Sequence, residues 1–221
     1  MAGYRIVTDS TTDITPGMIQ YLGITVIPLC FTLEGQTHQN IPGGGMPIAD
    51  FYGKLRAGST STTAQVNAEE FIETFSPILE AGEDVLYIAF SSGLSGTCQS
   101  AMIAKRQLAE RFPGRRVEVF DSLAASMGEG LLVYLAAQQK KAGASLDAAL
   151  QWLGENVLHL CHWFTVDDLN HLKRGGRVSA ATALVGTMLG IKPVLHVDDE
   201  GHLVPVSKVR GRRQSLDELV R

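Results

Sequence analysis

The spacing of apolar residues predicts alternating strands and helices over the first part of the chain. Short apolar runs rich in β-branched residues predict strands at 4–9, 24–33, 85–90 and 117–120. The run at 85–90 is continuous, which is typical of a strand covered on both faces. Helical spacing predicts helices around 16–22, 48–56, 67–79, 101–112, 125–141 and 145–157. This alternation favours an α/β fold with a parallel sheet and helices on both of its faces.

Capping residues mark several of these boundaries. Thr15 followed by Pro16 is a typical helix start, because proline is well suited to the first helical position, and Gly23 marks the end of that helix. Asn67, with Glu70 three residues later, predicts a second capped start. Residues 34–36 are a turn candidate.

The pattern changes after residue 157. The predicted elements are a strand at 160–166, a helical turn at 167–172, a basic turn at 173–177, a helix of small residues at 178–189, a hairpin with strands at 193–197 and 203–206, and a terminal helix after 210–213. We therefore expect an α/β domain at 1–157 and a second, α+β domain at 158–221.

The composition is that of an ordinary globular protein, with 45% hydrophobic and 19% charged residues. The formal net charge of −4 argues against nucleic acid as a partner. No apolar run approaches the roughly 18 residues of a membrane span, and the N-terminus has no signal-peptide pattern. Cys30, Cys98 and Cys161 are scattered in apolar contexts, so we expect buried thiols in a reducing compartment and a cytoplasmic location.

Hydroxyl-bearing segments follow the predicted strands. These segments are 9–13, 91–97 and 121–122, and a further cluster at 59–63 precedes the helix that Asn67 caps. In an open parallel sheet, ligands bind at the carboxyl ends of the strands. Hydroxyl groups and free N–H groups at helix starts suit a small anion, although the same residues also serve as caps and turns.

Other chemistries fit less well. Gly93–Thr97 has the first glycine and the serine of a nucleophile elbow, but Thr97 replaces the last glycine. There is no Walker A loop, no dinucleotide-binding glycine pattern after the first strand and no zinc-protease histidine pair. We assign the six histidines to core or surface roles and expect no metal site.

An ordered set of motifs resembles the DegV family, the fatty-acid-binding proteins that serve bacterial fatty acid kinase. The resemblance covers essentially the whole chain, and its strength lies in the order and spacing of the motifs. They are Val7–Thr11, Thr62–Val66 before Glu70–Phe71, Ser91–Thr97, Phe120–Ser122, Val166–Leu169, Lys173–Val178 and Gly190–Leu195.

The resemblance implies a two-domain fold with an acyl tunnel between the domains. A long-chain fatty acid would be the ligand, with no other cofactor, and the chain would not be an enzyme by itself. A threonine and a serine would bind the carboxylate. The threonine is Thr62, with Thr63 as a close alternative. The serine is Ser92, with Ser95 and Ser91 behind it.

The family also implies a protein partner. The ATP-binding subunit of fatty acid kinase would phosphorylate the bound carboxylate to an acyl phosphate for phospholipid synthesis. Arg177, with Lys173 and Arg174, would form part of the docking surface for that subunit. Transient membrane contact is compatible with this role.

The chain departs from the family pattern in two places. The family usually continues with a last strand–helix–strand portion, which contains a histidine near the head group, whereas this sequence stops at Arg221. We therefore expect part of the family fold to be missing. Ala64-Gln65-Val66 stands where the family has serine and then Gln-Pro, which leaves the choice between Thr62 and Thr63 open.

Two other functions compete with the carrier. An acyl hydrolase would use Ser92 or Ser95, but no motif places a histidine or aspartate to activate either hydroxyl. A lipid-free interaction module would use the basic segment 173–177 to bind an acidic partner.

Overall fold

The computed structural model describes residues 3–178 and 190–220. The chain divides into two compact units, Met1–Val157 and Leu158–Arg221. Most of the helix predicted at 178–189 lies outside the described residues. The acyl tunnel stays a prediction.

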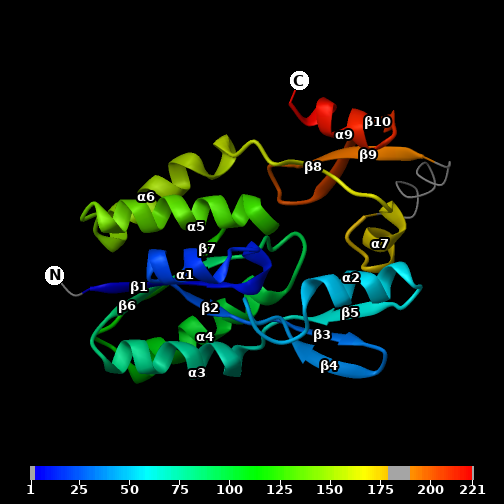
Figure 1. Cartoon of the computed structure of the whole chain (residues 1–221). Coiled ribbons are helices and arrows are strands. Elements are labelled where there is room, and N and C mark those ends of the chain that lie inside the picture. Colours follow the sequence, from blue (N-terminus) through cyan, green and yellow to red (C-terminus); the bar gives the residue numbers. More distant parts are fainter. Residues whose placement is uncertain (1–2, 179–189, 221) are drawn as a thin grey trace. The chain divides into compact units, whose positions relative to one another are not determined.

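The first unit contains the predicted parallel sheet (Figure 1). Its strands are β1 (Tyr4–Asp9), β2 (Thr25–Ile27), β6 (Asp84–Ala89) and β7 (Val117–Asp121), in the order β2-β1-β6-β7. The central strands β1 and β6 are almost wholly buried, which confirms the interpretation of the continuous apolar run. Because all four strands are parallel, their carboxyl ends lie along one edge.

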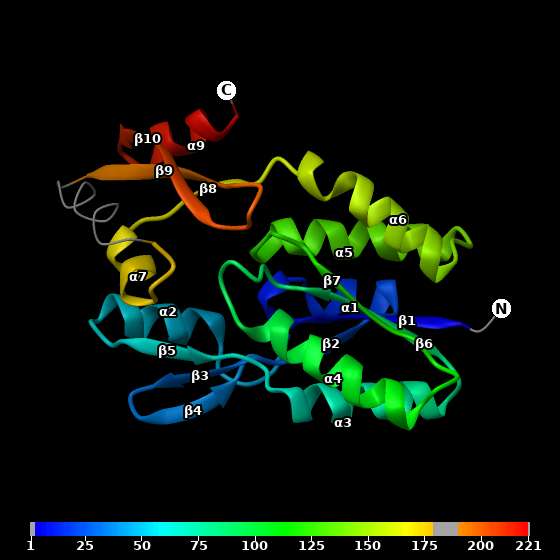
Figure 2. The same cartoon turned by 180° about the vertical axis from the view of Figure 1, so that it is seen from behind.

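Helices cover both faces of this sheet, as predicted (Figures 1 and 2). Helices α3 and α4 lie on one face, and α1, α5 and α6 lie on the other. Their bounds are α1 (Pro16–Leu22), α3 (Ala68–Glu80), α4 (Thr97–Arg111), α5 (Ser126–Lys141) and α6 (Leu146–Asn156), and a short 3-10 turn η1 (Ser10–Thr12) follows β1. Phe71 and Phe75 of α3 pack on Tyr87 of β6 in the core on the first face, and all three are fully buried.

The predicted caps are confirmed. The Thr15 side chain accepts a hydrogen bond from the Met18 N–H, and Gly23 ends α1 with a φ of +66°, a conformation that favours glycine. Asn67 and Glu70 form a capping box at the start of α3.

The single strand predicted at 24–33 is wrong. The segment forms two strands, β2 and β3 (Cys30–Leu33), which belong to different sheets. Pro28 stands between them and has no N–H to continue the ladder of β2. The predicted turn at 34–36 is confirmed: Glu34 and Gly35 both have positive φ in the hairpin that joins β3 to β4 (Gln36–Gln39).

A small antiparallel sheet extends the first unit, in the order β4-β3-β5, where β5 is Ser61–Ala64. Helix α2 (Ile48–Arg56) lies beside this sheet in both views, and Phe51 of α2 contacts Phe31 of β3. The hydroxyl cluster at 59–63 therefore lies partly in a strand.

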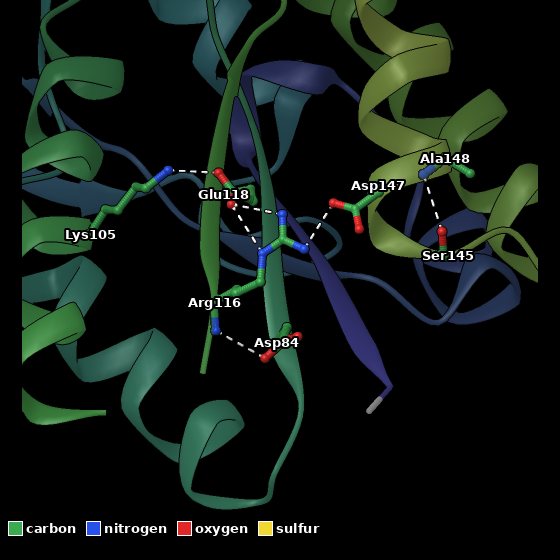
Figure 3. Close-up of polar contacts among 7 residues, drawn as sticks. All are labelled: Asp84, Lys105, Arg116, Glu118, Ser145, Asp147 and Ala148. Carbon is green, nitrogen blue, oxygen red and sulfur yellow. Dashed lines mark hydrogen bonds and ion pairs between the residues drawn. The ribbon is translucent and has the colours of Figure 1, made fainter. Parts of the chain in front are cut away.

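A charged network joins elements near the amino ends of the large sheet's strands (Figure 3). Arg116 bridges Glu118 of β7 and Asp147 at the start of α6, at 3.1 and 2.8 Å, and Lys105 of α4 also reaches Glu118. The Arg116 N–H donates to Asp84 at 3.0 Å. Because Arg116 and Asp147 are exposed, the expected contribution of their ion pair is at most about 1 kcal/mol.

The second unit is α+β. Its antiparallel sheet has the order β10-β9-β8, with β8 (Trp163–Thr165), β9 (Ile191–Val197) and β10 (Leu203–Arg210). Its helices are α7 (Leu169–Arg174) and α9 (Arg212–Leu219), and the 3-10 turn η2 (Val157–His159) starts at the last residue of the first unit. The predicted hairpin and terminal helix are confirmed. Leu169, Val178 and Leu195 form a small core.

Two expectations need correction. Lys173 and Arg174 lie in the last turn of α7 and not in a turn of irregular chain, because α7 starts after the Asp168 cap and ends only at the Gly175-Gly176 pair. Cys98 is buried and Cys30 partly buried, but Cys161 is exposed, since it lies just before the edge strand β8. No helix among the described residues has the length and apolar composition that crossing a membrane requires.

Candidate functional site

The carboxyl edge of the large sheet brings the predicted hydroxyl segments together. Strand β1 ends there at Asp9, and β7 ends there at Asp121. Strand β6 leads into the loop 90–96, the serine-rich loop. The Ser91 N–H donates to the Ala124 carbonyl at 3.0 Å, and the Ser122 N–H donates to the Ala89 carbonyl at 3.1 Å. These two bonds join the serine-rich loop to the segment that follows β7, so that the loop has a defined position.

The serine hydroxyls of this loop have different roles. The Ser95 hydroxyl accepts from the Thr97 N–H at 3.2 Å and lies 2.9 Å from the Thr97 hydroxyl, so it is engaged in a local turn just before α4. The Ser91 hydroxyl accepts from the Gly93 N–H. Ser92 is exposed, and its hydroxyl has no hydrogen-bond partner among the described residues. Ser92 is thus the hydroxyl of this loop that is available to a ligand.

The orientation of Ser92 depends on Asp121. One carboxylate oxygen of Asp121 accepts from the Ser92 N–H and the Leu123 N–H, both at 3.1 Å. Sequence reasoning placed Asp121 at the carboxyl edge without identifying this contact. The bond fixes the main chain of Ser92 and leaves its side chain free.

Thr62 and Thr63 lie on opposite faces of β5. Thr62 pairs with Thr32 of β3, whereas Thr63 pairs with Phe31. Both threonines are exposed. Because successive residues of a strand point to opposite faces, only one of them can face a given ligand.

Gln65 connects β5 to the serine-rich loop, a contact that sequence reasoning missed. The Gln65 side-chain amide donates to the Ser100 hydroxyl of α4 at 3.2 Å. Gly96 lies against Gln65 so closely that a Cβ at position 96 would clash with its amide oxygen. Gln65 directly follows the end of β5 at Ala64, so its contact with Gly96 brings this end of the strand close to the serine-rich loop. Thr63 and Thr62 both stay candidates for the partner of Ser92.

Two buried carboxyl groups lie beneath this edge. Asp9 and Glu129 are both fully buried, and Asp9 accepts from the Tyr87 hydroxyl at 2.6 Å. Burial, together with the charge of Asp9, raises the pKa of the Tyr87 hydroxyl well above its ordinary value. No Lys, Arg or His among the residues described pairs with either carboxyl group. Sequence reasoning did not identify Glu129.

The predicted docking residues lie in the second unit. Lys173 and Arg174 are in the last turn of α7, and Arg177 follows the glycine pair. All three are exposed, and an Arg177 guanidinium N–H donates to the Gly175 carbonyl. They form a local group of positive charges at the C-terminal end of α7 and just after it.

The residues described show no cluster of three or more His, Cys, Asp or Glu residues that could hold a metal ion. Neither Ser92 nor Ser95 has a hydrogen bond to a histidine in the described part of the chain. A serine nucleophile needs a base within hydrogen-bond reach, so this geometry gives no support to the hydrolase alternative.

Comparisons with known proteins agree on one family. A sequence profile described as "Uncharacterised protein, DegV family" matches residues 4–221. The DegV domain-containing protein CPE0026 of Clostridium perfringens is 44% identical over 220 residues, which are 99% of this chain and 75% of that protein.

Solved structures show the same fold. A DegV family protein from Thermus thermophilus, described as fatty acid binding, has a TM-score of 0.84 and 35% identity, over 100% of this chain and 76% of its own. A DegV lipid-binding protein from Thermotoga maritima has a TM-score of 0.85 and 31% identity, over 99% of this chain and 75% of its own.

The second residue of α4 offers a test of the electrostatics at this edge. Burial, followed by the charges of Asp121 and Asp9, raises the pKa of the Cys98 thiol to about 11. At pH 8 we therefore expect an alkylating reagent to modify the exposed Cys161 quickly and Cys98 only slowly. Mass spectrometry of peptides after timed alkylation measures both rates. Equal rates in the folded protein would contradict the described environment of Cys98.

Proposed function

Because the chain belongs to the DegV family, we propose that it is a carrier that binds one long-chain fatty acid by its carboxylate and presents it to a fatty acid kinase. The observation that carries this proposal is the Ser92 hydroxyl, which is exposed and has no partner among the described residues at the carboxyl edge of a parallel sheet. The descriptions of the solved relatives as fatty-acid- and lipid-binding proteins support the ligand class.

Ser92 and either Thr62 or Thr63 supply neutral hydrogen-bond donors to the fatty acid carboxylate. Donors of this kind stabilise an anion without neutralising its charge, so the oxygen stays nucleophilic toward a phosphoryl group. The acyl chain supplies most of the affinity, since burial of about ten methylenes contributes on the order of 8 kcal/mol before the costs of binding. The protein has no catalytic group of its own in this scheme, and the kinase's ATP-binding subunit forms the acyl phosphate.

The carrier and its two competitors differ in measurable ways. The hydrolase predicts turnover of p-nitrophenyl esters that Ser92→Ala abolishes. The interaction module predicts a protein that binds no lipid at all. The carrier hypothesis predicts that the protein binds one ligand per chain and does not turn it over.

The first prediction concerns the ligand. Organic extraction of the purified protein should release about one fatty acid per chain, because buried methylenes hold it tightly. Mass spectrometry of the extract identifies it, and protein denatured and washed before extraction is the control. If the washed native protein neither carries a fatty acid nor binds an added one, the proposal is wrong.

The second prediction concerns the head-group residues. Ser92→Ala and one of the two variants Thr62→Ala and Thr63→Ala should each weaken fatty acid binding by about 1–3 kcal/mol, because each removes a hydrogen bond to a charged group. The other threonine variant is the matched control, since Thr62 and Thr63 lie on opposite faces of β5. Ser95→Ala should instead lower the free energy of unfolding by about 1 kcal/mol, because it removes the hydrogen bond that the Ser95 hydroxyl accepts from the Thr97 N–H.

Calorimetric titration with a fatty acid, together with urea unfolding, separates these effects. The threonine variant that loses affinity identifies the face of β5 that meets the ligand, and unchanged affinity in both would contradict a threonine contact.

The third prediction concerns the kinase. Arg177→Ala should leave fatty acid affinity unchanged and slow acyl-phosphate formation, because a positive surface group speeds encounter with an acidic partner. The difference in rate between Arg177→Ala and the wild type should disappear at saturating carrier concentration and become smaller as the salt concentration rises. Arg213→Ala is the control, since it removes the same charge from another exposed position of the second unit. Kinase rates against carrier concentration at two ionic strengths give the result, and identical curves for both variants would remove Arg177 from the docking surface.

A further inference from the structure

Asp9 and Glu129 form a buried carboxyl pair whose hydrogen bonds can be counted. Asp9 ends β1 and Glu129 lies in the first turn of α5, and both are fully buried. No cation pairs with either group in the described part of the chain. Two adjacent negative charges in such a place would repel each other strongly, so at least one proton must reside on the pair.

The surroundings of Asp9 are those of a carboxylate. Its oxygens accept from the Thr11 N–H at 3.0 Å, from the Tyr87 hydroxyl at 2.6 Å and from the Phe90 N–H at 3.4 Å. The Thr11 hydroxyl also contacts the same Asp9 oxygen as its own N–H. The two N–H groups can only donate, so Asp9 acts as an acceptor toward its neighbours.

The surroundings of Glu129 are those of a neutral acid. One Glu129 oxygen lies 3.1 Å from the Thr8 hydroxyl and the other lies 2.7 Å from the Thr11 hydroxyl. Each hydroxyl has a single proton, and the Thr11 hydroxyl also contacts Asp9. If the Thr11 hydroxyl proton points to Asp9, it does not lie between Thr11 and Glu129. The 2.7 Å contact between the Thr11 hydroxyl and Glu129 is then a hydrogen bond only when Glu129 is protonated and donates to the Thr11 oxygen.

The other Glu129 oxygen is an acceptor. The Thr8 hydroxyl lies 2.9 Å from the Ile88 carbonyl, which can only accept, and can share its proton between that carbonyl and Glu129. Glu129 thus has one donor contact and one acceptor contact. A protonated carboxyl group and a side-chain amide both meet that requirement.

A glycine permits this close approach of α5. A Cβ at Gly130 would lie 2.7 Å from the backbone carbonyl oxygen of Thr12, which cannot move aside as a flexible side chain would. The Thr12 hydroxyl in turn donates to the Asp9 carbonyl at 3.0 Å. The start of α5 is therefore packed directly on the turn that follows β1.

We propose that Glu129 is a neutral carboxylic acid and a positioning residue for the carboxylate-binding loop. It donates to Thr11, Thr11 donates to Asp9, and the Asp9 carboxylate holds the N–H of Phe90, the residue that precedes Ser91 and Ser92. The strand ends then contain one buried negative charge and not two. The link to ligand binding rests on the proposed function, whereas the protonation of Glu129 does not.

The electrostatic surroundings agree with this assignment. Burial, followed by the charge of Asp9, raises the pKa of Glu129 well above its ordinary value, and the charge of Asp13 acts in the same direction. The bonds from Thr11 and Thr8 act in the opposite direction and are the smaller effect. Tyr87 of β6 and Cys98 of α4 are further titratable groups near Asp9. The raised pKa of Tyr87 keeps it protonated as a donor to Asp9, and burial followed by the charges of Asp121 and Asp9 raises the pKa of the Cys98 thiol.

The first arm of the test measures the proton directly. Infrared difference spectra of the folded protein and of Glu129→Gln at pH 7 should differ by the carbonyl band of a buried protonated carboxylic acid. The band should be present in the wild type and absent in the variant. A wild-type spectrum without that band, or a variant that retains it, would overturn the proposal.

The second arm follows stability with pH. An unfolded glutamate ionises near pH 4.3, whereas folded Glu129 keeps its proton, so folding takes up a proton above that pH. The wild type should therefore lose stability relative to Glu129→Gln as pH rises, by up to about tenfold in the folding equilibrium constant per pH unit until Glu129 itself ionises. Urea unfolding of both proteins from pH 5 to pH 8 measures the ratio. A ratio that stays constant or changes in the other direction would mean that folded Glu129 is ionised.

The third arm tests the positioning role. Glu129→Leu, which has neither donor nor acceptor, should weaken fatty acid binding, and Glu129→Gln, which keeps one of each, should retain most of the affinity that Glu129→Leu loses. Thr11→Val interrupts the chain of hydrogen bonds and should weaken binding by about tenfold, since it removes bonds to a buried charged group. Normal affinity in Thr11→Val would overturn the positioning role. A wild type that binds no fatty acid would instead refute the proposed function, and the first two arms would still decide the protonation of Glu129.

Discussion

The buried carboxylate of Asp9 is the interaction on which the rest of the candidate site depends. It joins the end of β1 to Tyr87 and to the Phe90 N–H at the end of β6, and through Thr11 it reaches Glu129 of α5. Four groups donate to Asp9: the N–H and the hydroxyl of Thr11, the Tyr87 hydroxyl and the Phe90 N–H. A buried charge without these donors would cost several kcal/mol, so all four groups must stay in place around the carboxylate. The position of the serine-rich loop follows from that arrangement, because Phe90 is the first residue of the loop.

The parallel sheet separates two kinds of polar group. The carboxyl edge contains neutral donors and buried carboxyl groups, where a ligand can displace water and meet fixed dipoles. The charged network around Arg116 and Glu118 lies near the opposite ends of the strands, where it is partly exposed to solvent and joins α4, β7 and α6 (Figure 3). Exposed pairs of that kind stabilise weakly, so the network connects elements and takes no part in the proposed chemistry.

The sequence predicts the parts of this structure that local rules determine. The caps at Thr15 and Asn67 and the hydroxyl segments at the carboxyl edge follow from residue type and spacing, and the structure contains them. The burial of Glu129 could not be predicted, because it depends on the approach of α5 to Thr12 that Gly130 permits, which is a tertiary contact. The choice between Thr62 and Thr63 stays open for a related reason: a shift of one residue reverses the face of a strand, so residue type and spacing do not decide which hydroxyl group faces a ligand.

The central claim is that fixed neutral donors at the carboxyl edge hold the fatty acid as its carboxylate. Carbon-13 NMR of a fatty acid labelled at its carboxyl carbon, bound to the protein and titrated from pH 5 to pH 8, tests this most directly. The account predicts a single bound resonance, distinct from that of free or micellar lipid, whose shift stays at the ionised value throughout and broadens or moves in Ser92→Ala. A bound carboxyl that titrates in this range as free lipid does, or whose resonance is the same in Ser92→Ala, would contradict the account.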